Sequence, residues 1–253
     1  EAVIAGNATM LHLLLGLDPE ALGVTPFIPV VDNELTIHAQ TVGLDMYSES
    51  QIHFLPHIGA YVGADLVSGL LATGLAQAQG VRLLVDVGTN GEIIIGSEDR
   101  VVATAAPAGP AFEGAQIHDG MRASEGAIEA VEINSHEIKL KVIGDCEPVG
   151  LCGSGLVDAV AQARITGLLD ATGRFLTYEK ATNCLEISNE LIDRIITFDD
   201  GMLGFVLAWE HETQHGRRII LSQRDIRELQ FAKAAIASGI DVVMRELGVD
   251  VND

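Results

Sequence analysis

The sequence has few cysteines and no long apolar run. Its 253 residues include only three cysteines, Cys146, Cys152 and Cys184, and none of them is part of a CxxC pair. An odd number of scattered thiols argues against an iron–sulfur or zinc site built from this chain alone, and is typical of reduced thiols in a cytoplasmic protein. No stretch approaches the ~20 apolar residues that a transmembrane helix needs, so the sequence predicts no membrane span.

Positive charge is also scarce. Lysine and arginine number 15 against 36 aspartates and glutamates, which gives a net charge of −21. Such a surface repels polyanions, so we expect no nucleic-acid partner and no binding to an anionic membrane. A single phosphate ligand can still bind where backbone N–H groups and a divalent cation receive it. The hydrophobic content of 48% is enough for one large domain or two packed subdomains.

The start of the chain indicates a longer protein. An apolar stretch follows Glu1 directly, and it lacks the basic segment that opens a signal peptide. We therefore expect the chain to be a piece of a larger polypeptide.

Hydrophobic periodicity and turn residues predict mixed helices and strands. The expected helices cover 7–16, 61–79, a segment from 153–155 to about 167, and 223–247. The expected strands lie at 2–5, 35–43, 51–55, 127–133 and 137–143, with a hairpin over 204–221. A three-stranded meander begins near Leu83, because Asn90-Gly91 between apolar runs is a strong hairpin signal. Asn7 is expected to cap the first helix, and Ser222 with Asp225 predicts a capping box for the last.

The turn at residues 86–92, DVGTNGE, is the most informative segment. The strand ends in Asp86, and small residues follow whose backbone N–H groups can approach phosphate oxygens. Asp86 can hold the water shell of Mg²⁺, which prefers one or two carboxylates together with phosphate oxygens. An ordinary hairpin turn with an acid at the strand end explains the same pattern, so both interpretations stay open.

Four further features are candidates for chemistry. Asp65 begins the helix before this strand, where it either acts as an acid or only complements the helix dipole. The segment 108–115, AGPAFEGA, contains a Gly-Pro turn, and 150–155, GLCGSG, opens a helix whose N-terminus offers an anion site. Lys233 lies on the apolar stripe of the last helix, where it either reaches water or faces a cleft that holds a nucleotide.

Two histidine patterns suggest metal sites but lack the required context. Residues 211–215, HETQH, match the HExxH pattern of zinc proteases, in which both histidines lie on one face of a stable helix. Gly216 follows at once and the flanking runs favour strands, so we expect a hairpin tip, with a zinc hydrolase as the alternative. His53 and His57 also have i, i+4 spacing, but the proline between them argues against a helical pair.

Taken together, the motifs resemble the C-terminal region of reductive activators of corrinoid proteins. The resemblance is carried by DVGTNGE, AGPAFEGA, GLCGSGLVD, SQRDIRELQFAKAAI, the opening GNATMLHLLLGL and the YVGADL segment. It implies an α/β, RNase H-like fold of the acetate and sugar kinase, heat-shock protein and actin (ASKHA) superfamily, in which two subdomains with mixed sheets flanked by helices clamp ATP. It places residues 1–58 in the first subdomain and 59–253, with the connecting helix, in the second.

The resemblance also implies a function. ATP binding and hydrolysis help to drive the reduction of inactive cob(II)alamin to cob(I)alamin in a corrinoid protein of a methyltransferase system. The electron comes from a 2Fe–2S cluster in a ferredoxin-like domain outside this chain. The implied partners are therefore ATP with Mg²⁺ and the corrinoid protein, and the family allows a homodimer. The alternative is a module of the same fold that docks the corrinoid protein without catalysis.

Residue roles follow from the same resemblance. Asp65 matches the acid that orients or deprotonates the attacking water, and Asp86, the second catalytic candidate, holds Mg²⁺ through water. The candidate nucleotide-binding residues are Gly88, Thr89, Asn90, Gly91, Glu92, Gly109, Pro110, Glu113, Gly153, Ser154, Gly155 and Lys233. No D-x-G-T first phosphate loop occurs upstream of Asp65, and no Gly-Gly adenosine turn follows the last helix. These two elements and the ferredoxin cysteines are expected outside this chain.

Overall fold

The computed structural model describes residues 1–184 and 186–251, which fold into two compact units. The first unit combines residues 1–106 with the chain from Ile236 onward, and the second covers residues 107–235.

The first unit opens with a small mixed sheet. Strand β1 (Ala2–Ile4) pairs in parallel with β3 (Gln51–Phe54), and β2 (Leu35–His38) pairs antiparallel with the other side of β3. Helix α1 (Ala8–Leu14) is capped as expected, since the Asn7 side chain accepts a hydrogen bond of 2.9 Å from the Met10 N–H. The short helix α2 (Glu20–Gly23) follows.

Two expected elements of this region are shorter than predicted. The strand expected over 35–43 ends at His38, because a 3₁₀ turn, η1 (Ala39–Val42), buries Ala39 and closes on Gly43 in the left-handed conformation. The helix expected over 61–79 is α3 (Ala64–Thr73), which ends at Gly74 with φ +63° before the turn η2 (Leu75–Gln77). A left-handed glycine is a common helix stop, so the apolar pattern alone overextended the helix.

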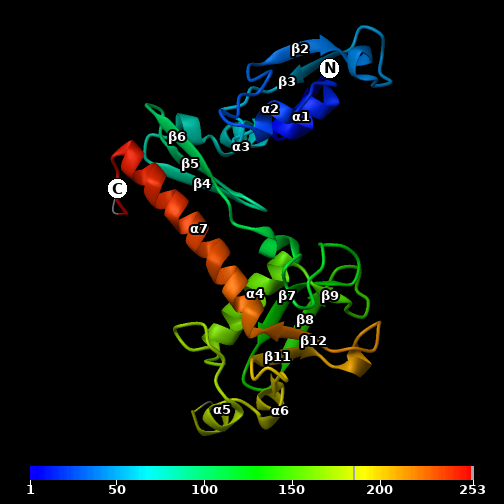
Figure 1. The fold of residues 1–253 in the computed structure, drawn as a ribbon, viewed down its shortest axis with the longest axis vertical. Helices are drawn as coiled ribbons and strands as arrows, with labels where there is room; N and C mark the ends of the chain where they lie inside the picture. Colours follow the sequence, from blue (N-terminus) through cyan, green and yellow to red (C-terminus); the bar gives the residue numbers. More distant parts are fainter. Residues whose placement is uncertain (185, 252–253) are drawn as a thin grey trace. The chain divides into compact units, whose positions relative to one another are not determined.

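The predicted meander is confirmed. Strands β4 (Arg82–Val87), β5 (Gly91–Gly96) and β6 (Val101–Ala106) pair antiparallel in sequence order, with Asp86 opposite Glu92. One face of this sheet packs against the C-terminal half of helix α7 (Gln223–Leu247; Figure 1). Within the described part of the chain β4 is an outer strand, and its Leu83 and Val87 side chains are 46% and 51% exposed.

The second unit contains two three-stranded sheets and several helices. The turn η3 (Pro110–Glu113) leads to the sheet β8–β7–β9, which consists of β7 (Ala127–Ile133), β8 (Ile138–Val142) and β9 (Gly150–Leu151). Helix α4 (Gly153–Ile165) lies against β7 (Figure 1). Helices α5 (Tyr178–Cys184) and α6 (Asn189–Ile192) precede the antiparallel sheet of β10 (Ile195–Thr197), β11 (Leu203–Ala208) and β12 (Ile219–Ser222). The turn η4 (Glu210–Glu212) connects β11 to β12.

Helix α7 (Gln223–Leu247) begins with the predicted capping box. The Ser222 N–H donates to Oδ2 of Asp225 at 2.7 Å, and the Asp225 N–H donates to the Ser222 hydroxyl at 3.2 Å. The other oxygen of Asp225 accepts the His118 N–H at 2.9 Å. Burial raises the pKa of Asp225, and these hydrogen bonds oppose that rise by favouring the ionised form.

The described residues can be compared with the apolar runs and the cysteines of the sequence. Over residues 1–184 and 186–251, no helix is both long and apolar enough to cross a bilayer. Cys146 and Cys152 are free thiols, partly buried and buried respectively, whereas the side chain of Cys184 lies outside the described part.

Candidate functional site

A cavity of about 480 Å³ in the first unit brings together parts of the chain that are distant in sequence. It lies where α1 and α3 begin and where the β4–β5 turn ends. Its lining residues are Asn7, Ala8, Thr9, Pro19, Leu22, Gly23, Ala60, Tyr61, Gly63, Asp65, Asn90 and Glu92. Of the residues predicted from the sequence, Asp65, Asn90 and Glu92 therefore share one cavity.

The starts of α1 and α3 meet through a glycine contact. A Cβ atom added to Gly63 would lie 2.7 Å from Cα of Asn7 and 2.6 Å from Oδ1 of Asp65, closer than real side-chain carbons approach. The Asp65 N–H also donates to the Gly6 carbonyl at 3.3 Å. Gly63 is therefore required for α3 to approach the loop after β1, and this approach forms one wall of the cavity.

Asp65 is held by its own helix turn. One carboxylate oxygen, Oδ1, accepts the Leu66 N–H at 2.9 Å, and the residue is only partly buried. That bond uses only one of the two carboxylate oxygens, so the second, Oδ2, can accept from a ligand or a water molecule. A carboxylate with one fixed and one available oxygen suits the predicted role of orienting a water molecule.

The β4–β5 hairpin adds further negative charge. Burial raises the pKa of Glu92, and the carboxylates of Asp86 and Asp65 raise it further by repulsion. A divalent cation would relieve this repulsion. Within the described part of the chain, no three His, Cys, Asp or Glu side chains group into a metal-binding cluster. Mg²⁺ keeps water and phosphate oxygens among its ligands and needs no such cluster, and its binding here stays a prediction.

The two glycines of the hairpin turn have different roles. A Cβ atom on Gly91 would lie 2.6 Å from Cγ1 of Ile236, so this glycine is needed for packing against α7. A Cβ atom on Gly88 would meet nothing closer than the Asn90 carbonyl at 3.6 Å. Packing does not require a glycine at position 88, whereas close approach of a phosphate to the backbone would.

The candidate residues of the second unit form a separate group with packing roles. A Cβ atom on Gly153 would lie 2.0 Å from the Phe112 carbonyl oxygen, and one on Gly155 would lie 2.1 Å from the Ile128 carbonyl oxygen. The Ser154 hydroxyl donates to the Glu129 carbonyl at 2.8 Å. The GLCGSG segment therefore brings α4 into contact with β7 and with the turn η3, and its nucleotide role stays a prediction.

The other predicted residues of the second unit are more exposed. Gly109 has φ +81° with no atom within 4 Å of an added Cβ, and it precedes Pro110 and Glu113 in η3. Lys233 is exposed on α7. These residues belong to the second unit, and their contact with a nucleotide stays a prediction.

The HETQH segment does not form a metalloprotease helix, which confirms the predicted hairpin connection. His211 lies in the single turn η4, and its partner His215 follows in the loop to β12. The His215 ring accepts the Arg217 N–H at Nδ1, 3.1 Å away, and its Nε2 lies 2.9 Å from the Val149 carbonyl. Both ring nitrogens of His215 are thus engaged by the backbone.

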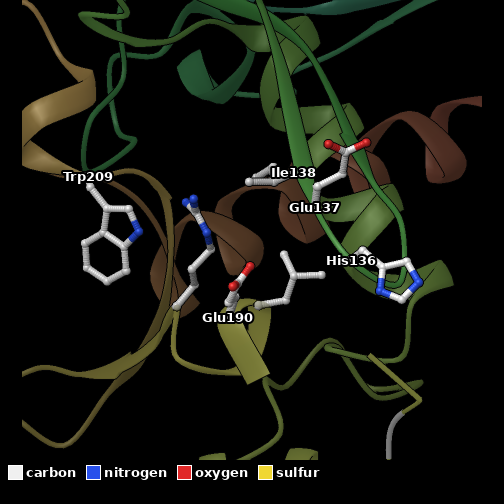
Figure 2. Close-up of a pocket in the computed structure, with 7 residues that line it drawn as sticks. His136, Glu137, Ile138, Glu190 and Trp209 are labelled. Carbon is white, nitrogen blue, oxygen red and sulfur yellow. The ribbon is translucent and has the colours of Figure 1, made fainter. Parts of the chain in front are cut away.

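A second cavity, of about 310 Å³, lies in the second unit. Figure 2 shows Trp209 across this pocket from His136 and Glu137. The Arg194 side chain is 13% exposed, and its Nη1 donates to the carbonyls of Val206 and Leu207, each at 3.0 Å. The Nη1 group of Arg194 is thus engaged by the backbone.

Sequence reasoning did not assign Asn7, Thr9 and Tyr61 to the site. From the sequence, the GNAT segment predicts only a family motif and a helix cap. The available signal was the pair of small-residue turns, GN at 6–7 and GAD at 63–65, each of which directly precedes or opens a helix.

Comparison with known families divides the chain into two matched regions. Residues 1–78 match the RACo middle region, and residues 80–253 match the C-terminal domain of RACo, the ASKHA domain. These boundaries differ from the division at residue 58 expected from the sequence, which stays a prediction.

Three characterised proteins are similar to the chain. It is 34% identical over 253 residues to the corrinoid activation enzyme RamQ of Eubacterium limosum, covering all of this chain and 42% of that protein. It is 30% identical over 154 residues to the [Co(II) methylated amine-specific corrinoid protein] reductase of Methanosarcina barkeri, covering 52% of this chain and 28% of that protein. A solved structure of a reductive activator for corrinoid, iron–sulfur protein matches with a TM-score of 0.80 and 38% identity over 99% of this chain and 38% of that one.

These matches confirm the resemblance inferred from the motifs and the RNase H-like ASKHA class of the fold, which is a nucleotide-binding class. The chain spans less than half the length of each of the three proteins. The chain belongs to the RACo family, of which it contains the middle region and the C-terminal ASKHA domain.

Proposed function

We propose that the chain forms the ATP-binding and ATP-hydrolysing part of a reductive activator that returns cob(II)alamin of a corrinoid protein to cob(I)alamin. The observation that carries the proposal is the cavity at which the starts of α1 and α3 meet the Asp86–Glu92 hairpin. The cavity contains Asp65, the candidate water-orienting acid, and the hairpin that borders it carries Asp86 for Mg²⁺ and the open backbone position at Gly88. The relatives of the chain are corrinoid activators.

Each residue has a distinct task in this proposal. The small residues at Gly88–Asn90 let phosphate oxygens approach the backbone of the turn, in which the Gly88 N–H itself donates to the Asn90 carbonyl at 2.9 Å. Asp86 receives Mg²⁺ through water. Bound Mg²⁺ neutralises charge that builds on the phosphoryl group. The available oxygen of Asp65 orients or deprotonates the attacking water. The electron comes from a 2Fe–2S domain outside this chain, and the corrinoid protein is the partner.

The test uses the full-length protein and measures ATP hydrolysis with and without its corrinoid protein. We expect Asp65→Asn and Asp86→Asn each to lower kcat by about 10²-fold or more, because general-base assistance and metal positioning each contribute on that scale. Asp99→Asn is the matched control, since Asp99 is exposed in the turn between β5 and β6, away from the Asp86–Glu92 end of β5.

Three outcomes separate the competing functions. Wild-type turnover in both aspartate variants would show that the phosphates bind elsewhere. Unchanged activation of the corrinoid protein without ATP turnover would favour the docking module. If Asp65→Asn and Asp86→Asn lower kcat only as much as Asp99→Asn does, the result would show only a general effect of removing negative charge.

A further inference from the structure

The first turn of α3 has no side-chain cap of the usual kind. Its N-cap residue is Gly63, which has no side chain to accept the exposed N–H groups of the helix start. These donors nevertheless all have partners. The Ala64 N–H donates to Nδ1 of His57 at 3.2 Å, Asp65 donates to the Gly6 carbonyl, and Leu66 donates to the Asp65 side chain. His57 thus replaces the missing cap of the helix that carries Asp65.

The hydrogen bond fixes the tautomer of His57. Because Nδ1 accepts the Ala64 N–H, it carries no proton, and the proton of the neutral ring is on Nε2. The residue is 8% exposed, and its own N–H donates to the Asp32 carbonyl at 2.8 Å, so backbone and ring are both held. Nε2 is buried and has no hydrogen-bond partner among the described residues.

The electrostatic surroundings keep the ring neutral. Burial lowers the pKa of His57, and the nearby His12 lowers it further, while Asp65 and Asp32 act in the opposite direction. His12 is itself buried, with Nδ1 2.7 Å from the Ala8 carbonyl and Nε2 accepting the Val30 N–H. A neutral His57 is the form that can accept at Nδ1, so the burial of the ring supports the observed hydrogen bond.

We propose that His57 is a positioning residue for Asp65. By accepting the Ala64 N–H, it fixes the start of α3 and with it the direction of the neighbouring carboxylate. The buried Nε2–H of His57 has no partner, which lowers the stability of the folded protein. A smaller hydrogen-bond acceptor at this position would not have that cost. The effect on catalysis rests on the proposed function, whereas the effect on α3 does not.

Three variants of the full-length protein test the proposal. His57→Leu removes the acceptor, and His57→Asn retains one, because the amide oxygen takes the place of Nδ1. His53→Leu is the matched control: His53 lies on β3, and its Nδ1 is 2.9 Å from the Thr36 hydroxyl rather than near α3. We expect His57→Leu to lower kcat of ATP hydrolysis by about tenfold to a hundredfold, as a small misplacement of a catalytic group does.

The KM for ATP should change little, because the lost interaction acts on the attacking water rather than on bound ATP. His57→Asn should recover most of kcat, and His53→Leu should behave as wild type. Equal losses of kcat in the leucine and asparagine variants would overturn the proposal, as would wild-type kcat in His57→Leu.

Amide hydrogen exchange of the peptide covering residues 62–73 gives a second readout that needs no ATP. His57→Leu should exchange about fivefold or more faster at the start of α3, since one hydrogen bond has been lost, whereas His57→Asn should match wild type. Unchanged exchange in His57→Leu would overturn the proposal. If the wild-type protein hydrolyses no ATP, the proposed function fails, and this exchange result alone decides the role of His57.

Discussion

Replacing Gly153 with alanine tests whether the start of α4 is a packing contact or a phosphate loop. The added Cβ would lie 2.0 Å from the Phe112 carbonyl oxygen and 2.8 Å from its carbon, so the backbone must move by about 1 Å to accept it. Overpacking of this kind costs typically about 1–3 kcal/mol. The contact is with backbone, which yields less than a side chain, so we expect a loss of about 2 kcal/mol in the free energy of unfolding.

Urea unfolding followed by tryptophan fluorescence provides the assay. Trp209 is the single tryptophan of the chain and lies in the second unit, the unit that contains Gly153. With a denaturant slope of about 1–3 kcal/mol per molar urea, a loss of about 2 kcal/mol lowers the midpoint by about 1 M. An unchanged midpoint for Gly153→Ala would refute the packing explanation of this glycine.

Gly88→Ala is expected to behave in the opposite way. No atom lies within 3.6 Å of the added Cβ, and the φ of Gly88 is outside the left-handed region, so stability should stay within about 0.5 kcal/mol of wild type. Mg-ATP affinity of the full-length protein should fall by about tenfold or more, because the added methyl group would keep a charged phosphate away from the backbone of this turn. Gly80→Ala, also with open space around the added carbon, is the control. Unchanged affinity in Gly88→Ala would show that no phosphate approaches this turn.

Three further results are expected. The pKa of Glu92 is raised in the folded protein, so its contribution to stability is fully present below the ordinary pKa of 4.5 and is lost as the pH rises through the raised pKa. The free energy of unfolding of Glu92→Gln in urea should therefore increase relative to that of the wild type between pH 4.5 and 7. A difference between the two proteins that stays constant with pH would contradict this. The kcat of the wild-type protein should fall as the pH drops through the pKa of His57, which burial lowers below its ordinary value of 6.5, because protonated His57 cannot accept the Ala64 N–H. His57→Asn should lack this limb of the pH profile, and identical profiles would contradict the prediction. Elemental analysis of purified protein should find far less than one zinc per chain, whereas stoichiometric zinc that disappears in His211→Gln would restore the hydrolase alternative.

Elements with strong local signals were predictable from the sequence. The β4–β5 hairpin follows from Asn90-Gly91 between two apolar runs, and α7 follows from the Ser222–Asp225 box with its apolar stripe. Both signals are short-range, and no distant contact overrides them.

Features that depend on distant contacts were not predictable. Asn7 and Thr9 reach the cavity only because Gly63 allows α3 to approach the loop after β1. In the same way, Gly153 has the local pattern of an anion loop, but its closest neighbour is the carbonyl of Phe112 from another segment. A glycine pattern shows that something comes close to the backbone, and it does not distinguish a phosphate from a peptide group.

The exposed side of β4 has a practical consequence for handling the chain. Leu83 and Val87 project from an outer strand whose unpaired backbone groups can pair with a strand of another molecule. Apolar side chains on such an edge favour this pairing, so the isolated chain is expected to self-associate as its concentration rises. Light scattering across a dilution series would define the concentration range in which binding and unfolding data describe single molecules.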